Sequence, residues 1–211
     1  MTLRDVGLTA WRWLRYGFAA IYPLAPAWSA NRKIRHESMQ RADGDTIKAL
    51  REASLGIGES ARAELITLFS DDLARLRRLE DKLSGQMATV ALLSGVASVV
   101  GGAAVSQRNL GALVLVGCGF VWLVSAGLLA IEGSRAMPLH LPDPVGAVRD
   151  GALDLPQRLA ADRLQALSLN ASRGWQLNNA LFAAQRSLVV AVMLLIASGI
   201  VTTAHQFAHR K

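Results

Sequence analysis

The sequence predicts an all-α integral membrane protein with three transmembrane helices, because its 211 residues contain three long uncharged segments that are strongly apolar. These segments cover residues 83–107, 109–131 and 187–204 and contain 25, 23 and 18 residues. A helix rises ~1.5 Å per residue, so about 20 apolar residues cross the ~30 Å hydrocarbon core of a bilayer. A buried soluble bundle is the alternative, but soluble helices carry a polar face and these segments are apolar on all sides.

Residues 1–30 are expected to form an amphipathic interfacial helix. Aromatic side chains alternate there with arginines, a mixture that suits the headgroup level of a membrane. A cleaved signal peptide is disfavoured because Arg12 and Arg15 fall where such a peptide needs an apolar core. A fourth span over residues 13–30 is the alternative, and it would bury Arg15 in the bilayer or place the basic N-terminus outside.

Residues 31–84 are expected to form a cytoplasmic linker and an amphipathic helix. Pro23 and Pro26 are expected to stop any helix before the linker. The linker is expected to be a flexible polar loop that carries a basic cluster, Arg32, Lys33 and Arg35. Within the helix, apolar residues recur at steps of three or four and form one stripe along a charged rod. The stripe, which needs a partner helix, consists of Leu65, Phe69, Leu73, Leu76, Leu79 and Leu83.

Residues 85–132 are expected to form a hairpin of two spans. Three polar residues, Gln107, Arg108 and Asn109, lie where the two apolar segments meet, and lipid tolerates no exposed irregular backbone, so the connection must be tight. Small residues at helical spacing on the first and third spans would let helix backbones approach closely. Packing within the chain and oligomerisation are the two interpretations of this set, which comprises Ser94, Ser98, Gly102, Ala191 and Gly199.

Residues 133–186 are expected to form a cytoplasmic loop and a helix. Prolines and glycines predict the loop, and Pro156 can open the helix because a first helical turn needs no backbone donor at that position. Gly174 is the candidate break in a helix that otherwise continues into the third span, residues 187–205. This helix, which carries few charges, is the expected partner of the apolar stripe. Residues 206–211 form the expected external tail.

Charge placement predicts the orientation of the spans. Of the 23 Lys and Arg residues, 20 lie before the first span or between the second and the third. By the positive-inside rule, the N-terminus is cytoplasmic and the C-terminus lies outside. The net charge of +7 and the pI near 10.5 therefore follow mainly from topology, and no nucleic-acid polymer is expected as a partner.

The sequence contains no recognisable catalytic constellation, so neither an enzyme nor a cofactor or metal site is predicted. Cys118 lies in the second span with no base beside it and is interpreted as a small core residue. His205 and His209 have the i, i+4 spacing of a metal pair, but no Cys, Asp or Glu accompanies them in the tail, so an exposed polar terminus is expected. The spans contain no internal acid or base, which argues against a proton-coupled transporter but leaves an apolar pore open.

The order of elements carries a family resemblance over residues 59–203. It rests on residues 76–79 (LRRL) continuing into residues 84–93 (SGQMATVALL), and on residues 167–170 (LSLN) continuing into residues 188–190 (LVV). The chain resembles bacterial anti-phage membrane effectors, the Pycsar transmembrane effectors and the related SLATT family. The resemblance implies an oligomeric effector in the bacterial inner membrane that disrupts this membrane when a partner cyclase supplies a cyclic nucleotide.

A non-enzymatic scaffold or accessory subunit, which recruits a partner through its cytoplasmic helices, is the main alternative function. A small transporter or a lipid-modifying enzyme is a further class, for which no residue can be named. If a nucleotide binds, its negative charge needs cations, and the preferred supply lies within about two turns of the first span, at Arg75, Arg77 and Arg78. These arginines have a second interpretation as anchors to anionic lipid, each contributing ~1 kcal/mol.

Overall fold

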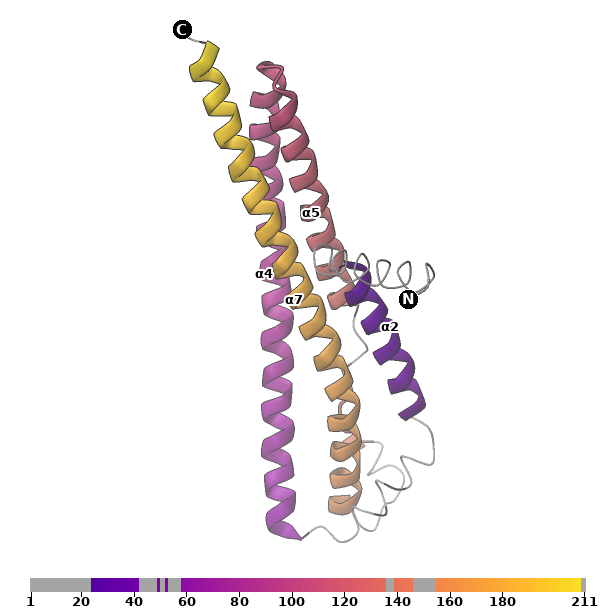
Figure 1. The fold of residues 1–211 in the computed structure, drawn as a ribbon. Helices are drawn as coiled ribbons and strands as arrows, with labels where there is room; N and C mark the ends of the chain where they lie inside the picture. The colour runs from indigo at the N-terminus through magenta and orange to yellow at the C-terminus, as the bar shows by residue number, and fades with distance from the viewer. Residues whose placement is uncertain are drawn as a thin grey trace, which may run out of the picture. The chain divides into compact units, whose positions relative to one another are not determined.

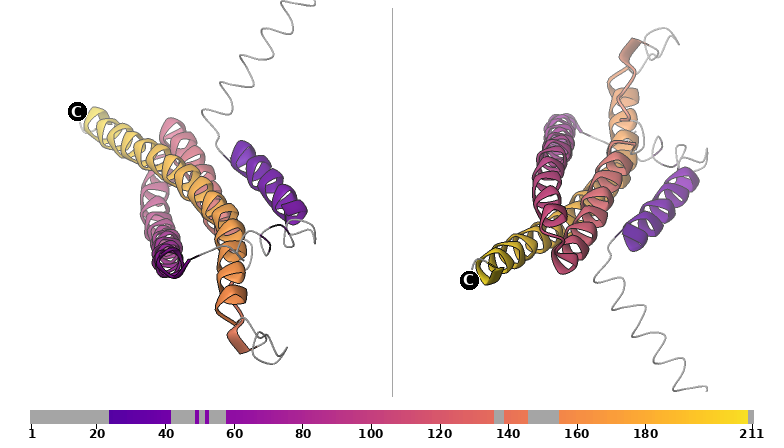
Figure 2. Two further views of the ribbon diagram at one scale, coloured as in Figure 1. Left: turned by 90° about the horizontal axis from the view of Figure 1, so that it is seen from below. Right: turned by 90° about the horizontal axis from the view of Figure 1, so that it is seen from above.

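The fold was obtained as a computed structural model, which describes residues 24–41, 49, 52, 58–135, 139–145 and 155–209. Within these residues the regular secondary structure is helical and contains no strand, as Figure 1 and Figure 2 show, and the predicted all-α class is confirmed. The helices are α2 (Leu24–Arg41), α4 (Glu59–Ser106), α5 (Leu110–Ser134) and α7 (Leu155–His209). Most of the predicted interfacial segment, residues 1–23, lies outside the described residues.

Three of these helices, α4, α5 and α7, are long and apolar enough to cross a membrane. In the most apolar stretch of α4, 11% of the residues are buried inside the protein, and in those of α5 and α7 the share is 33%. Large apolar side chains therefore remain exposed along these stretches, among them Leu92, Val99, Leu110 and Met193. Since a soluble monomer rarely exposes so much contiguous apolar surface, the three helices indicate a membrane protein.

The chain divides into two compact units. Unit 1 comprises Met1–Ser29, Lys82–Gly133 and Ala180–Lys211, and unit 2 comprises Ala30–Asp81 and Ser134–Asn179. All three apolar segments belong to unit 1, whereas unit 2 contains the polar parts of the long helices. The helices α4 and α7 are each continuous through residues of both units, with 48 and 55 residues respectively.

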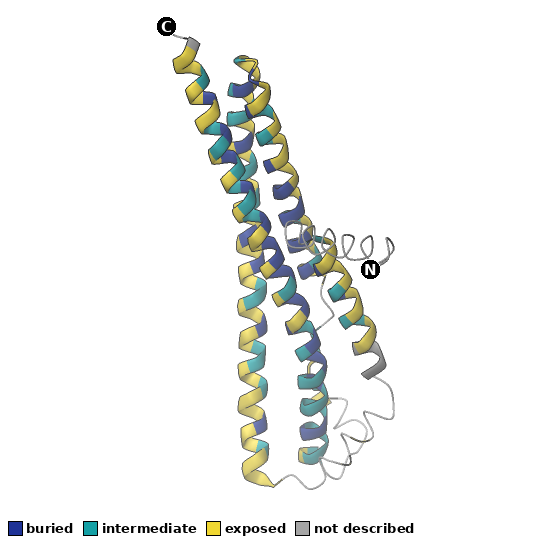
Figure 3. Ribbon diagram, viewed as in Figure 1, coloured by how far each residue is buried: buried dark blue, intermediate teal, exposed yellow. Residues whose placement is uncertain are grey.

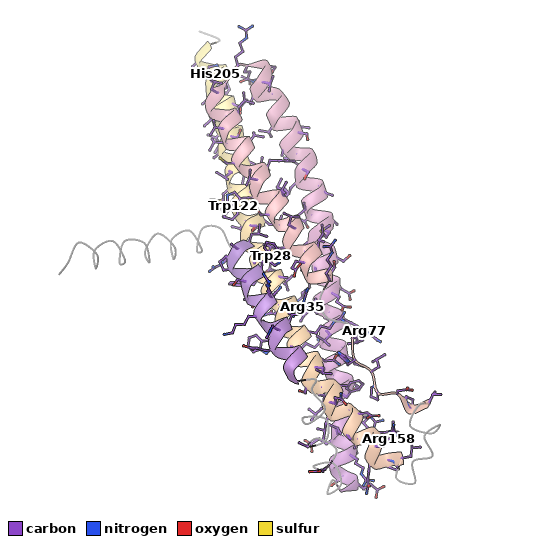
Figure 4. The ribbon with its side chains drawn as sticks, turned by 90° about the vertical axis from the view of Figure 1, so that its right-hand side faces the viewer. Trp28, Arg35, Arg77, Trp122, Arg158 and His205 are labelled. Atoms are coloured by element: carbon purple, nitrogen blue, oxygen red, sulfur yellow. The ribbon has the colours of Figure 1, made fainter. Side chains whose placement is uncertain are left out.

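Unit 1 has a small core between α4, α5 and α7. Its buried residues are Ala97, Trp122, Leu123, Ala191 and Leu195, of which Trp122 is labelled in Figure 4. Gly119 of α5 allows the close approach of α7, since a Cβ there would lie 3.5 Å from the Ala191 carbonyl oxygen. The buried Ser198 hydroxyl donates to the Ala112 carbonyl over 3.0 Å and joins α7 to α5 without leaving a polar group unpaired.

The predicted tight hairpin is confirmed by the turn between α4 and α5. Arg108 adopts a φ of 51°, and the amides of Arg108 and Asn109 bond back to the Val105 and Ala104 carbonyls, the pattern of a Schellman C-cap. The Asn109 side-chain oxygen then accepts from the Ala112 amide over 3.1 Å and caps α5. Arg108 thus ends α4 and Asn109 starts α5, so the turn leaves few backbone amides and carbonyls unpaired.

The expected flexible loop after residue 31 is wrong up to Arg41, because α2 covers Leu24–Arg41. Pro23 and Pro26 do not exclude this helix, since Pro26 falls in its first turn, where a missing backbone donor costs nothing. Packing supplies a further reason for the helix. In unit 1 the buried Ala27 belongs to one apolar cluster with Leu129, Ala183 and Ala184, and the partly buried Leu24 packs against this cluster.

In unit 2 the apolar stripe of α4 is buried as predicted. Leu65 and Leu76 are buried and Phe69, Leu73 and Leu79 are half-buried, while most other positions on this part of α4 are exposed, as Figure 3 shows. Burial of a leucine side chain such as Leu76, which is 1% exposed, contributes roughly 1.5–3 kcal/mol.

The helix α7 begins at Leu155, as the position of Pro156 predicts, and it continues through Gly174 without a break. Gly174 instead lies against α4. A Cβ at this position would come within 3.4 Å of the Leu76 Cδ2 atom, so α7 provides the partner surface that the stripe requires.

Candidate functional site

The described residues contain no group of three or more His, Cys, Asp or Glu side chains that could hold a metal ion. His205 is half-buried at the end of α7, and the side chain of His209 lies outside the described part. The core interpretation of Cys118 is wrong, because this side chain is exposed on α5. A thiol is small and weakly polar, so it fits an apolar outer surface as well as a core.

The candidate site is a pocket in unit 2. Arg75 and Leu79 of α4 and Gly174, Trp175 and Asn178 of α7 line it, and its volume is about 290 Å³. This volume lies at the lower end of the ~300–1,000 Å³ range of small-molecule sites. The lining combines one cation, one large aromatic ring and one amide with an aliphatic side chain.

Helical spacing places these side chains together. Arg75 and Leu79 are four residues apart on α4, as Gly174 and Asn178 are on α7, so each pair occupies one face of its helix. Gly174 makes room for the arginine, because a Cβ there would lie 2.9 Å from the Arg75 Nη2 atom. Glycine inside a helix costs ~1 kcal/mol relative to alanine, and the guanidinium lying against the helix is a physical reason for it.

Arg75 is the polar centre of the pocket. Its Nη2 atom lies 2.8 Å from the Asp72 Oδ1 atom, and its side chain remains 57% exposed whereas that of Asp72 is 14% exposed. The Asp72 carboxylate is mostly buried and needs this ion pair, whereas the guanidinium is more than half exposed and keeps free donors for an incoming anion. Trp175 is 65% exposed and presents a large ring at the pocket.

Polar contacts outside the pocket hold α7 in position. Arg173 pairs with Glu80 of α4. The buried Gln176 side chain donates to the Asn31 carbonyl of α2 over 3.4 Å. Earlier in α7, the fully buried Asn170 accepts from the His140 amide and donates to the His140 carbonyl, both over 3.1 Å. The helix is therefore attached to α4, to α2 and to the segment 139–145 by groups adjacent to the pocket.

The structure separates the predicted cationic cluster. Arg75 lines the pocket, but Arg77 and Arg78 are exposed elsewhere on α4, with Arg77 labelled in Figure 4. The Arg78 Nε atom donates to the Ala74 carbonyl of its own helix over 3.2 Å. The role of all three arginines as ligand-binding residues stays a prediction.

The second basic cluster lies on α2. Arg32 and Lys33 are exposed and Arg35 is half-buried, and Lys33 forms an i, i+4 contact with Glu37 at 3.7 Å. Neither Arg32 nor Lys33 lines the pocket. The pocket therefore takes its cation from the cluster nearer the first apolar segment.

The predicted oligomer-packing residues of unit 1 differ in exposure. Ser98 and Gly102 are exposed on α4, Ser94 is half-buried, and the hydroxyls of Ser94 and Ser98 donate to carbonyls of their own helix. Gly199 is half-buried, whereas Ala191 is 0% exposed and packs inside the core of a single chain. The exposed small residues of α4 leave a face on which another helix could pack, and oligomerisation through it stays a prediction.

Sequence reasoning missed the contribution of α7 to the pocket. Gly174 drew attention only as a candidate helix break, and Trp175 carried no signal as one aromatic residue within a helix. The signal that could have identified the pair is a glycine in mid-helix directly before a tryptophan, in a segment with few charges. Only the pairing of α7 with α4 brings these residues to Arg75.

No protein-family model, curated protein or solved structure matches this chain. The pocket in unit 2 and the apolar helices of unit 1 are therefore the basis for assigning a function.

Proposed function

We propose that this protein is a non-enzymatic membrane effector of a bacterial anti-phage system of the abortive-infection type. A cyclic nucleotide from a partner cyclase triggers it in the cytoplasm, and an oligomer of the protein then disrupts the inner membrane. The resemblance in element order to Pycsar transmembrane effectors and the SLATT family supports this class. The single structural observation that carries the proposal is the continuity of α4 and α7.

A continuous helix transmits displacement because its backbone hydrogen bonds keep it stiff. At ~1.5 Å per residue, the 48 residues of α4 extend ~72 Å, more than twice the ~30 Å hydrocarbon core. The residues that line the pocket belong to the same two helices that contribute spans to unit 1. A ligand that shifts α4 against α7 in unit 2 therefore acts directly on two of the three apolar helices, a small shift of packed helices of the kind that switches proteins.

Disruption of the membrane requires that the transmembrane helices rearrange within the bilayer. Exposed small residues on α4, Ser98 and Gly102, supply a surface on which helices of neighbouring subunits can pack closely. The placement of Lys and Arg supports a cytoplasmic N-terminus and an external C-terminus, so that unit 2 faces the cytoplasm, where a cyclase product is available.

The test is inducible expression in bacteria together with a cyclase that makes cyclic pyrimidine nucleotide. We expect membrane potential, followed with a voltage-sensitive dye, to collapse when both proteins are present, and phage plating to fall. Expression with a catalytically inactive cyclase is the matched control and should leave both readouts unchanged. Unchanged membrane potential and phage plating with the active cyclase would contradict the proposal.

A scaffold or accessory subunit is the second candidate, and two exposed apolar residues of unit 2 favour it. Ile66 is 49% exposed and Leu68 is 53% exposed on α4, outside the apolar segment of that helix. Large apolar side chains at such positions suit a contact with another protein. Stoichiometric copurification of one partner in detergent, lost in an Ile66→Ser and Leu68→Ser double variant and without toxicity on overexpression, would favour this function over the effector.

A further inference from the structure

We infer that the pocket lined by Arg75, Leu79, Gly174, Trp175 and Asn178 binds a small phosphate ester that carries a flat aromatic ring, the class to which cyclic mononucleotides belong. The inference rests on the proposed function for the role of the ligand, and it names the site and the contacts. Arg75 binds the phosphate, the ring stacks on Trp175, and the amide of Asn178 hydrogen-bonds the ring edge or the sugar.

Arg75 is suited to a phosphate because a guanidinium presents several donors in a planar fork that matches two phosphate oxygens. It is the cation among the residues that line the pocket. Its present partner is the Asp72 carboxylate, three residues earlier on the same helix at 2.8 Å. A guanidinium carries five N–H donors, so it can bind phosphate oxygens while it stays paired with the mostly buried Asp72 carboxylate. One cation matches a ligand with a single negative charge better than a polyphosphate.

Trp175 supplies the recognition of the ring. Stacking of a nucleobase on an aromatic side chain contributes about 1–3 kcal/mol and tolerates any base. The exposed fraction of 65% shows that this ring is accessible in the single chain. The Asn178 amide carries both donors and an acceptor, so it can hydrogen-bond either an acceptor or a donor on the edge of a base.

A lipid headgroup also offers a phosphate, and distance along the helices argues against it. Arg75 precedes the first apolar segment by eight residues, or ~12 Å of helix, and Trp175 precedes the third by twelve residues, or ~18 Å. The headgroup layer adds only about 5–8 Å to each side of the hydrocarbon core. The pocket therefore lies on the water side of that layer.

The experiment measures binding to the full-length protein in detergent by titration calorimetry. The probes are the cyclic ribonucleoside monophosphates of adenine, guanine, cytosine and uracil, with inorganic phosphate and nanodiscs of anionic lipid as comparisons. We expect at least one cyclic nucleotide to bind, and Arg75→Gln to weaken it by at least ~tenfold, the equivalent of 1.4 kcal/mol. Arg32→Gln removes an exposed arginine of α2 that does not line the pocket and should leave the affinity unchanged.

Two further variants separate loss of the site from loss of the fold. Gly174→Ala places a methyl group 2.9 Å from the resting Arg75 Nη2 atom, so it should displace the guanidinium and weaken binding about tenfold or more, while alanine raises helix propensity. Trp175→Leu should weaken binding similarly. The control for Trp175→Leu is Trp28→Leu, because Trp28 is 63% exposed and lies outside the pocket.

The inference is overturned if no cyclic nucleotide binds, if Arg75→Gln and Arg32→Gln bind equally well, or if binding is seen only with anionic nanodiscs. Binding of inorganic phosphate as tight as that of the nucleotides would overturn the role of Trp175. Membrane potential in cells separates this inference from the proposed function. Pocket-dependent binding without depolarisation supports the nucleotide site and contradicts the effector function. Depolarisation that survives Gly174→Ala supports the effector function and contradicts the nucleotide site.

Discussion

At the scale of single residues, Gly133 stands where the three long helices of unit 1 pack tightly. A Cβ added at Gly133 of α5 would lie 2.7 Å from the Leu83 Cδ1 atom of α4 and 3.0 Å from the Ala180 Cβ atom of α7. Leu83 is 3% exposed and Ala180 is 0% exposed, so neither has free space into which it can move. A side chain at Gly133 must therefore displace the Leu83 side chain and crowd Ala180.

We therefore predict that Gly133→Val lowers the free energy of unfolding by about 1–3 kcal/mol, the usual cost of overpacking. The measurement is unfolding in detergent followed by circular dichroism. Gly117→Val is the matched control, since that glycine lies on the same helix and a Cβ there would meet no atom within 4 Å. Equal stability of the two variants would show that the Gly133 contact does not constrain the helices.

In the turn between α4 and α5, a glycine substitution is expected to raise the free energy of unfolding. Among the described residues, Arg108 is the non-glycine residue with a positive φ, at 51°, a conformation that L-residues other than Asn and Asp adopt at a cost. Arg108→Gly should relieve this strain and raise the free energy of unfolding by about 0.5–1 kcal/mol. Gln107→Gly, at the preceding residue, should lower it by a similar amount, because no strain is relieved there. Chemical denaturation in detergent checks both signs.

At the scale of elements, the proposed function depends on the continuity of α4. Gly85 is exposed in this helix, and a Cβ there would meet nothing within 4 Å, so the position tolerates a side chain. A proline there removes the bond from its amide to the Asp81 carbonyl and kinks the helix at the start of the first apolar segment.

We predict that Gly85→Pro abolishes triggered depolarisation while nucleotide binding in the pocket changes less than ~twofold, since the pocket lies more than a turn away. Gly85→Ala keeps the helix straight and should behave as the unaltered protein. Dye-reported membrane potential and calorimetry on membrane-extracted protein provide the two readouts. Full depolarisation by Gly85→Pro would exclude transmission along α4.

At the scale of the whole molecule, the charge asymmetry leads to a testable topology. In a Cys118→Ser background, Gln206→Cys at the end of α7 should react with a membrane-impermeant thiol reagent in intact spheroplasts. Ser60→Cys at the start of α4 should react only after permeabilisation. Both substituted residues are exposed, and the charge placement predicts that residue 206 lies outside and residue 60 in the cytoplasm. The reverse pattern of labelling would mean that the N-terminus lies outside, and a nucleotide in the cytoplasm could not then reach unit 2.

The residues that the sequence predicted well are those whose environment depends on neighbours within one helix. The apolar stripe from Leu65 to Leu83 is a local repeat, and its burial follows from helical geometry whichever partner covers it. The tight hairpin follows in the same way from the three polar residues between two apolar segments. The expected loop after residue 31 was wrong up to Arg41 because propensity and proline counting ignore the contacts of Ala27 with α5 and α7, which stabilise the start of α2.

The sequence alone therefore determined the helical class, the three apolar helices and the position of the hairpin, since each depends on composition, length and spacing along the chain. The tertiary structure decided which residues share a site. Arg75 was predicted as one of three equivalent arginines, and only the pairing of α4 with α7 places it beside Gly174, Trp175 and Asn178. About a hundred residues of chain separate the two halves of this pocket, and no local pattern records a contact that packing creates over such a separation.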